Sequence, residues 1–268
     1  MPFEIHRRDG TVLHTDHMAG DLRAAVRMAL SKRVDLSGAL LDGADLRRFD
    51  LEDARLAQAS LVRADLSGAN IEDAVLIGAD LSGARLDGSN LEDADLTDAV
   101  LVGASARGAN LEDARLAGAD LSRAVFEGSN LERANLHGAV VEGARFARAN
   151  LERTYLVKVR GAGASFAKAN LERADMADAS LVGADLSGSH LARCDLHGAD
   201  LSEANLASAY LERSNLRGAN LSGADLRDAY LSKCDIEQAV LHGARLDSAH
   251  MDRMRGTPAR PSGSGPYR

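Results

Sequence analysis

Residues 90–109 read NLEDADLTDAVLVGASARGA, and residues 110–129 read NLEDARLAGADLSRAVFEGS. Both stretches of twenty residues begin with the same four letters, and an apolar residue stands at every fifth position in each. The residue two places before that position is small, either alanine or serine. Two periods, of five and of twenty residues, therefore run together through this part of the chain, and together they decide the fold.

The five-residue period extends from Leu36 to Met251 without a shift in register, which makes 44 consecutive units. A period of five matches neither the 3.6 residues of a helix nor the two of a strand, so the chain must turn between units. The twenty-residue period indicates that four units form one coil, and stacked coils lie about 4.8 Å apart. The sequence predicts an all-β, four-sided solenoid of about eleven coils over residues 34–254, about 53 Å long.

This pattern, A(D/N)LXX, resembles that of the pentapeptide-repeat family, as in Ala44-Asp45-Leu46 and Ala64-Asp65-Leu66. The resemblance covers residues 34–254 and implies a right-handed quadrilateral β-helix. Two units depart from the pattern, because Ala106 and Gly161 replace the central apolar residue.

The segment before the repeats, residues 1–33, has a different pattern. Alternating residues surround Asp9-Gly10, which predicts a hairpin, and an apolar stripe after Asp21 predicts a helix. We expect the hairpin and helix to cap the first coil; an independent binding module is the alternative. At the other end, residues 255–268 are rich in Pro, Gly and Ser and are predicted to be a disordered tail.

Composition and the two cysteines narrow the class of protein. Only 3% of residues are aromatic and none is Trp, so the core must consist of stacked Leu and Ala. The chain has no apolar run of 18 residues and no secretion signal, which favours a cytoplasmic protein away from membranes. Cys194 and Cys234 occupy inward positions about 9.6 Å apart, too far for a disulfide, and are expected to be small buried residues.

The sequence offers no candidate for catalysis. The eight histidines form no HxxxH motif and no metal spacing with cysteine, and the glycines recur as turn residues rather than as a phosphate loop. The carboxylates would lie on a convex surface without a cleft. We therefore expect no enzymatic activity, no metal and no cofactor.

Charge is the most informative feature of the predicted surface. One outward column carries Glu in most coils, and its neighbour, here called the Asp–Arg column, changes from Asp to Arg or Lys between positions 113 and 133. Residues 34–130 have a net charge of −11, whereas residues 131–254 have −2. The acidic wall is defined as the eight carboxylates of the first half, Glu52, Asp53, Glu72, Asp73, Glu92, Asp93, Glu112 and Asp113.

Eight carboxylates over about 19 Å approach the roughly eleven charges of B-DNA in that length. The Qnr-type quinolone-resistance proteins of the pentapeptide-repeat family are acidic rods that bind DNA gyrase in place of DNA. The resemblance thus implies a DNA mimic with a type II topoisomerase as protein partner, which protects that enzyme from poisons and makes no direct contact with nucleic acid. This chain departs from those relatives because it lacks their C-terminal dimerisation element and their projecting loops.

Two other interpretations of the acidic wall stay open. The charge only keeps the rod soluble, or the rod is a regulatory or structural scaffold that binds a different protein through its uncapped C-terminal end or its column of aromatic residues. The solubility interpretation is supported by the neighbouring Glu and Arg columns, whose side chains can pair with one another.

Within the core, Phe126, Phe146 and Phe166 recur one coil apart and predict a stacked interior ladder of rings. Gly161 lies in the same coil as Phe166, so it is expected to leave room for that ring. The alternative is that Gly161 marks a kink or groove.

The residues near the C-terminal end predict that the chain forms a homodimer. The column that holds Asn up to position 170 continues as His190, Tyr210, Tyr230 and His250, beside basic residues, and aromatic and basic side chains are typical of interfaces. The last coil has no following helix to cover it. We expect a homodimer in which two C-terminal ends meet, with a monomer covered by its own tail as the alternative. The predicted interface residues are Tyr210, Tyr230, Leu246, His250, Met251 and Met254.

Overall fold

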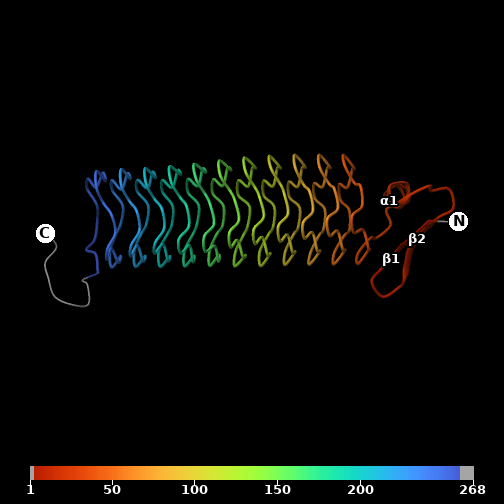
Figure 1. The fold of residues 1–268 in the computed structure, drawn as a ribbon, viewed down its shortest axis with the longest axis horizontal. Coiled ribbons are helices and arrows are strands. Elements are labelled where there is room, and N and C mark those ends of the chain that lie inside the picture. Colours follow the sequence, from red (N-terminus) through yellow and green to blue (C-terminus); the bar gives the residue numbers. More distant parts are fainter. Residues whose placement is uncertain (1–2, 260–268) are drawn as a thin grey trace.

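The computed structural model describes residues 3–259 and has the form of a straight rod (Figure 1). A hairpin and one helix lie at the N-terminal end of the rod, and the last described coil lies at the opposite end. Among residues 3–259, no helix combines the length and the apolar character that crossing a membrane requires.

Parallel bridges join each coil to the next and confirm the twenty-residue period. They begin with Leu40 and Ser60 and continue in steps of five residues to Asp235 and Arg255. In a representative unit, the Leu91 amide donates to the Asn110 carbonyl at 2.6 Å, and the Asn110 amide donates to the Ser89 carbonyl at 2.9 Å. Each side of the rod is therefore a narrow parallel sheet that runs along its length.

The chain turns between sides because one residue per unit adopts a left-handed backbone. In every unit from Leu36 to Met251, the second residue after the central one has a positive φ, for example 57° at Asp93 and 65° at Gly83. Glycine takes this conformation without strain, whereas other residues accept a small cost. Side chains at this position project outward from the corners of the rod.

The interior is a stack of central residues and the small residues two places before them. Phe126, Phe146 and Phe166 are fully buried, with ring centroids 5.2 and 5.0 Å apart and planes within 7° of parallel. The predicted ring ladder is thus confirmed. The interpretation of Gly161 needs correction, because the side chains of Val141 and Leu181, one coil to either side, fill the space that a β-carbon would take.

Both cysteines are free and buried. The Cys194 thiol donates to the Leu171 carbonyl and the Cys234 thiol to the Leu211 carbonyl, each at 2.9 Å. Burial raises the pKa of the Cys234 thiol to about 11. The prediction of small buried residues without a disulfide is confirmed.

The N-terminal segment contains β1 (Phe3–His6), β2 (Val12–Asp16) and α1 (Leu22–Ser31). β1 and β2 pair antiparallel around the Asp9-Gly10 turn. The Asp21 side chain caps α1 by accepting from the Ala24 amide at 2.7 Å, which satisfies one of the free amides of the first turn. The buried face of the helix contains Ala25, Val26 and Ala29.

This segment is bonded to the first coil. The Leu40 amide donates to the His6 carbonyl at 2.8 Å, and Arg7 forms a bridge with Ala39. The Arg7 side chain also donates from Nε to the Ser37 carbonyl at 2.8 Å. The hairpin therefore pairs with backbone groups that would otherwise form an open sheet edge.

At the other end, the prediction of a disordered tail from residue 255 is wrong for residues 255–259. Ile236 donates to the Arg255 carbonyl at 2.9 Å, and Ala259 donates to the Ala239 carbonyl at 2.9 Å. The backbone amides and carbonyls at the free edge of the preceding coil can pair with any backbone. A segment rich in Pro, Gly and Ser can therefore still form hydrogen bonds there. The remainder of the predicted tail, residues 260–268, lies outside the described residues.

Candidate protein-binding wall

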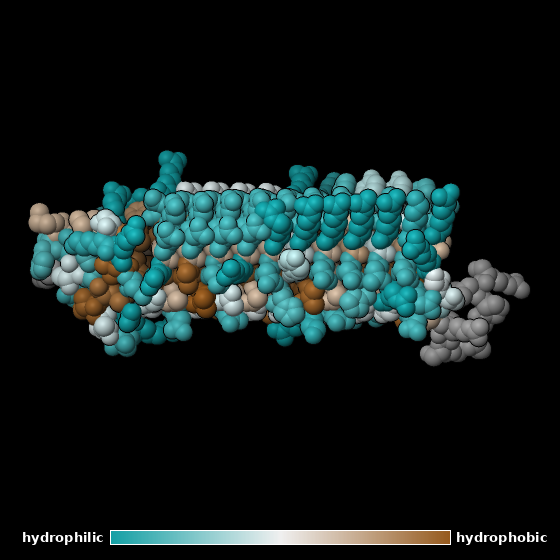
Figure 2. Space-filling model, turned by 180° about the vertical axis from the view of Figure 1, so that it is seen from behind, coloured by the Kyte–Doolittle hydropathy of each residue, from teal (hydrophilic) through white to brown (hydrophobic). Residues whose placement is uncertain are grey.

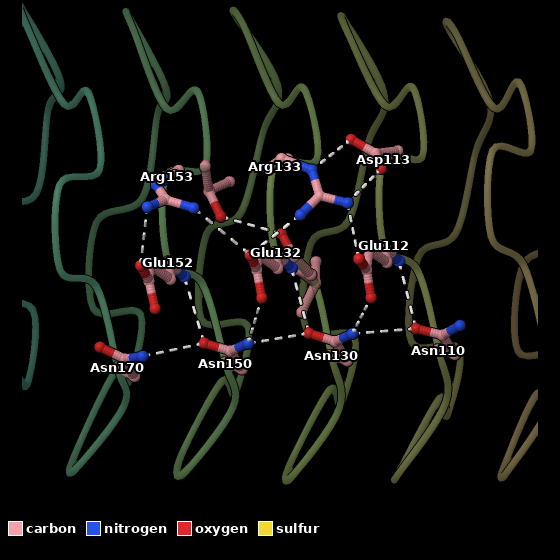
Figure 3. Close-up of polar contacts among 12 residues, drawn as sticks. Asn110, Glu112, Asp113, Asn130, Glu132, Arg133, Asn150, Glu152, Arg153 and Asn170 are labelled. Carbon is pink, nitrogen blue, oxygen red and sulfur yellow. Dashed lines mark hydrogen bonds and ion pairs between the residues drawn. The ribbon is translucent and has the colours of Figure 1, made fainter.

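The side of the rod that carries the acidic wall is organised by a ladder of asparagines. The Asn110 side-chain amide donates to Asn90 Oδ1 at 2.9 Å and to Glu92 Oε2 at 3.1 Å, both in the preceding coil. Figure 3 shows how the bonds between asparagines repeat from Asn110 to Asn170. We call these residues the Asn ladder: Asn70, Asn90, Asn110, Asn130, Asn150 and Asn170.

The Asn ladder also holds the glutamates in place. Glu72, Glu92 and Glu112 each accept from the asparagine of the next coil, at 3.0, 3.1 and 2.9 Å. Their side chains are half-buried, whereas Asp53, Asp73 and Asp93 at the neighbouring corner are exposed. The glutamates therefore have a structural role in addition to their charge.

Arg133 forms ion pairs with the last two carboxylates of the acidic wall, Glu112 and Asp113. Its Nε donates to Asp113 Oδ1 at 2.9 Å, its Nη2 donates to Glu112 Oε1 at 2.6 Å, and its Nη1 reaches Glu132 Oε1 at 2.9 Å (Figure 3). Hydrogen bonds from this guanidinium hold the pKa of the Asp113 carboxyl below its ordinary value. Glu112 and Asp113 are therefore bonded within the rod and are less available to a partner than carboxylates without an ion pair.

The other six members of the acidic wall have no ion pair among residues 3–259. The pKa of Glu72 is raised by partial desolvation and, next, by repulsion from Glu52 and Glu92. Like charges one coil apart thus remain uncompensated in this half of the wall. We call the six the free carboxylates: Glu52, Asp53, Glu72, Asp73, Glu92 and Asp93.

Farther along the rod, the Asp–Arg column becomes basic and its pairing weakens. Arg153 lies 3.7 Å from Glu152, and Arg173 lies 3.8 Å from Glu172. Arg193 reaches Glu172 only at 4.0 Å. In the described part of the chain, the last three members have no ion pair and are exposed: Arg213, Lys233 and Arg253.

The residues predicted to form a dimer interface lie in two places. Tyr210, Tyr230 and His250 belong to a stack of rings on the side wall, with centroids 4.9 and 4.6 Å apart. Leu246, Met251 and Met254 belong instead to the last units, where Met251 is 40% exposed. The end-to-end dimer stays a prediction, and the side-wall rings form a separate surface.

The N-terminal end of the acidic wall borders a groove between α1 and the first coils. Three of the free carboxylates line it together with arginines from the cap and the neighbouring coils. Its lining includes Arg27, Arg33, Arg48, Arg55, Glu52, Asp53 and Asp73. Within residues 3–259, no three His, Cys, Asp or Glu side chains are arranged to hold a metal ion.

Sequence patterns located the charged columns but missed the contacts between coils. The column of asparagines was visible in the twenty-residue period, and repeated Asn on one face of a solenoid is a signal for such a ladder. The reach of Arg133 to the preceding coil has no comparable signal, since it depends on side-chain geometry. For this reason the eight predicted wall residues include two that are internally paired.

Comparisons with known proteins agree with this architecture. The family described as Pentapeptide repeats matches eight copies over residues 35–73, 74–113, 109–146, 144–181, 179–218 and 219–253. None of the curated proteins matches the chain.

Two solved structures are similar. HetL, from the cyanobacterium Nostoc sp., is 28% identical with a TM-score of 0.52, and the match covers 85% of this chain and 93% of HetL. It is described as a pentapeptide repeat protein involved in the regulation of heterocyst differentiation. QnrB1, a plasmid-mediated fluoroquinolone resistance protein, is 18% identical with a TM-score of 0.41 over 66% of this chain and 91% of QnrB1, and the likeness concerns the fold alone.

Proposed function

The chain belongs to the pentapeptide-repeat family, whose members form right-handed quadrilateral β-helices, and we propose that it is a non-enzymatic protein-binding rod. Its free carboxylates would dock on a basic surface of a partner protein. The observation that carries the proposal is the absence, among residues 3–259, of any ion pair to these six groups, although the other two members of the acidic wall, Glu112 and Asp113, pair with Arg133.

The spacing of the free carboxylates supports a partner surface that ordinarily holds DNA. Six carboxylates in three coils occupy about 14 Å, and B-DNA carries about eight charges in that length. In its most concrete form the partner is a type II topoisomerase, DNA gyrase, which the rod would protect from poisons by acting as a DNA mimic. Direct binding to nucleic acid is disfavoured, because like charges repel.

The test removes charge at the exposed corner of the wall. The triple variant Asp53→Asn, Asp73→Asn, Asp93→Asn should lose binding to gyrase and lose protection in a supercoiling assay, and wild-type binding should weaken as salt rises. The matched control is Asp98→Asn, Asp178→Asn, Asp228→Asn, which removes three aspartates from the same left-handed corner position on other sides of the rod. Equal binding by the two triple variants would refute a role for the wall.

A second function is favoured by the similarity to HetL, which extends over most of both chains. In this alternative, the rod is a regulatory scaffold for a partner that does not bind DNA. Capture of partners from the native host with the wild-type and triple-variant rods separates the two functions. A scaffold that uses another surface would retain its partner in the triple variant.

A further inference from the structure

The Asp–Arg column has opposite unpaired charges at its two ends. Asp53, Asp73 and Asp93 lie toward the N-terminal end, and Arg213, Lys233 and Arg253 lie toward the C-terminal end. All six are exposed, and all have a left-handed backbone with φ between 56° and 66°. Their β-carbons therefore leave the rod in the same direction from the same corner.

The two triplets also have the same spacing, because consecutive members are one coil apart in both. Arg153 lies midway between them: Asp93 and Arg213 are three coils from it, Asp73 and Lys233 four coils, and Asp53 and Arg253 five. A two-fold axis perpendicular to the rod at Arg153 would thus place every acidic member opposite a basic one. No change in spacing is needed, since both rods have the same rise of about 4.8 Å per coil.

We propose that this wall binds a second copy of the chain in an antiparallel arrangement. The two-fold axis passes near Arg153, and six ion pairs form, three at each end of the contact. The occupant is a second copy because its own wall supplies complementary charges in the matching order and with the matching rise. This contact is isologous, so it closes on itself and leads to a dimer rather than a filament.

The column that contains the Asn ladder fits this arrangement. The same axis places Asn70 opposite Tyr230 and Asn90 opposite Tyr210, where amides meet ring edges and hydroxyl groups. It also places Asp50 opposite His250. Hydrophilic side chains stand in regular rows along a face of the rod, as Figure 2 shows for one view, so two such faces can approach in register.

Other groups limit the strength of the contact. In the Glu column, Glu92 would face Glu212, and Glu52 would face Asp252, so these pairs repel. Nearer the axis, Glu132 would face Glu172 and Glu152 would face its own copy, and these pairs repel as well. Near the axis, Arg153 would face its own copy and Arg133 would face Arg173, so these like charges also repel. Arg133 is in addition already bonded to carboxylates of its own rod. The strip is about 48 Å long and about 10 Å wide, which buries on the order of 1,000 Å² in total and corresponds to a weak, transient interface.

Self-association of this kind would cover the free carboxylates. A rod in the dimer could not present them to another protein, so the second copy and the proposed partner would compete for one surface. The inference does not rest on the proposed function, because the dimer forms from the chain alone.

The test uses opposite charge reversals in the full chain, measured by sedimentation equilibrium at high micromolar concentration and low salt. We expect Lys233→Glu and Asp73→Lys each to weaken dimerisation at least tenfold, because each places two like-charged pairs in the homodimer. An equal mixture of the two variants should dimerise again, since the heterodimer restores opposite charges at both contacts. Effects within one rod cannot explain such complementation.

Lys158→Glu is the matched control, because Lys158 is exposed and has the same left-handed corner position on another side. It should dimerise as the wild type does. A wild type that stays monomeric at high micromolar concentration would overturn the inference, as would two single variants that fail to complement each other. Lys233→Glu leaves the free carboxylates intact, so retained partner binding by this variant separates a failure of the dimer from a failure of the proposed function.

Discussion

At the scale of single residues, Gly161 lies in the core at a position with no room for a β-carbon. A β-carbon there would lie 2.8 Å from Val141 Cγ2 and 2.9 Å from Leu181 Cδ2. We expect Gly161→Ala to destabilise the rod by about 1–3 kcal/mol, as overpacking does in other cores. Urea unfolding measures the loss. Addition of Val141→Ala should recover part of it, and strictly additive losses would show that the two side chains do not share this space.

The role of Gly161 also shows where prediction from the sequence stops. The twenty-residue period correctly placed the three phenylalanines in one interior column. It did not reveal that Val141 and Leu181, from the column of Gly161 itself, lean into the vacant position. Periodicity specifies which residues stack, whereas the direction in which each side chain leans depends on rotamers and neighbours.

A second prediction at this scale concerns Arg133 and pH. Because the pKa of Asp113 is lowered in the folded rod, the pair stabilises the fold above the ordinary aspartate pKa of about 3.9. This contribution is lost as pH falls through the lowered folded-state pKa. The side chains are more than one third exposed, so Arg133→Gln should cost at most about 1 kcal/mol at neutral pH.

Urea unfolding of Arg133→Gln and the wild type across the acidic range checks this sign. The difference in unfolding free energy should shrink toward zero as the pH falls below the folded-state pKa of Asp113. Arg123→Gln, at the same corner position on another side, is the control. A difference that grows on acidification would contradict the assignment.

At the scale of elements, Arg23 forms hydrogen bonds that join α1 to the first coils. Its guanidinium donates to the Asp45 carbonyl at 2.7 Å and to the Arg47 carbonyl at 2.8 Å, and it lies 4.5 Å over the Phe49 ring. The hairpin and helix were predictable from the Asp9-Gly10 turn and the apolar stripe. The attachment was not, because a single arginine on a helix gives no periodic signal.

Arg23→Ala should therefore loosen the helix without unfolding the coils. We expect faster amide hydrogen exchange in α1, by roughly tenfold or more if the lost hydrogen bonds contribute about 1.5–3 kcal/mol. Arg27→Ala is the control, because Arg27 lies 5.6 Å over the same ring and is farther from it. Equal exchange in the two variants would mean that Arg23 does not hold the cap.

At the scale of the whole molecule, stacking brings residues that are twenty positions apart in the sequence into contact. The charges available on the surface therefore depend on pairing between coils as well as on the sequence of each coil. The sequence predicted the columns of the wall correctly, since they follow from the register alone. It overestimated the number of available carboxylates, because Glu112 and Asp113 pair with a residue one coil away. It also treated the side-wall tyrosines and the end of the rod as one surface.

This separation makes the place of self-association testable. Leu241 and Leu246 are partly buried in the last units, away from the Asp–Arg column, whereas Met251 lies only two residues from Arg253 and is left unchanged. Under the wall contact, Leu241→Asp with Leu246→Asp should keep most of the dimer in sedimentation equilibrium. A contact through the C-terminal ends, as predicted from the sequence, would instead be lost, because each end would bring two carboxylates into it. The same measurement on Lys233→Glu should give the opposite result, so the pair of variants assigns the dimer to the wall or to the end.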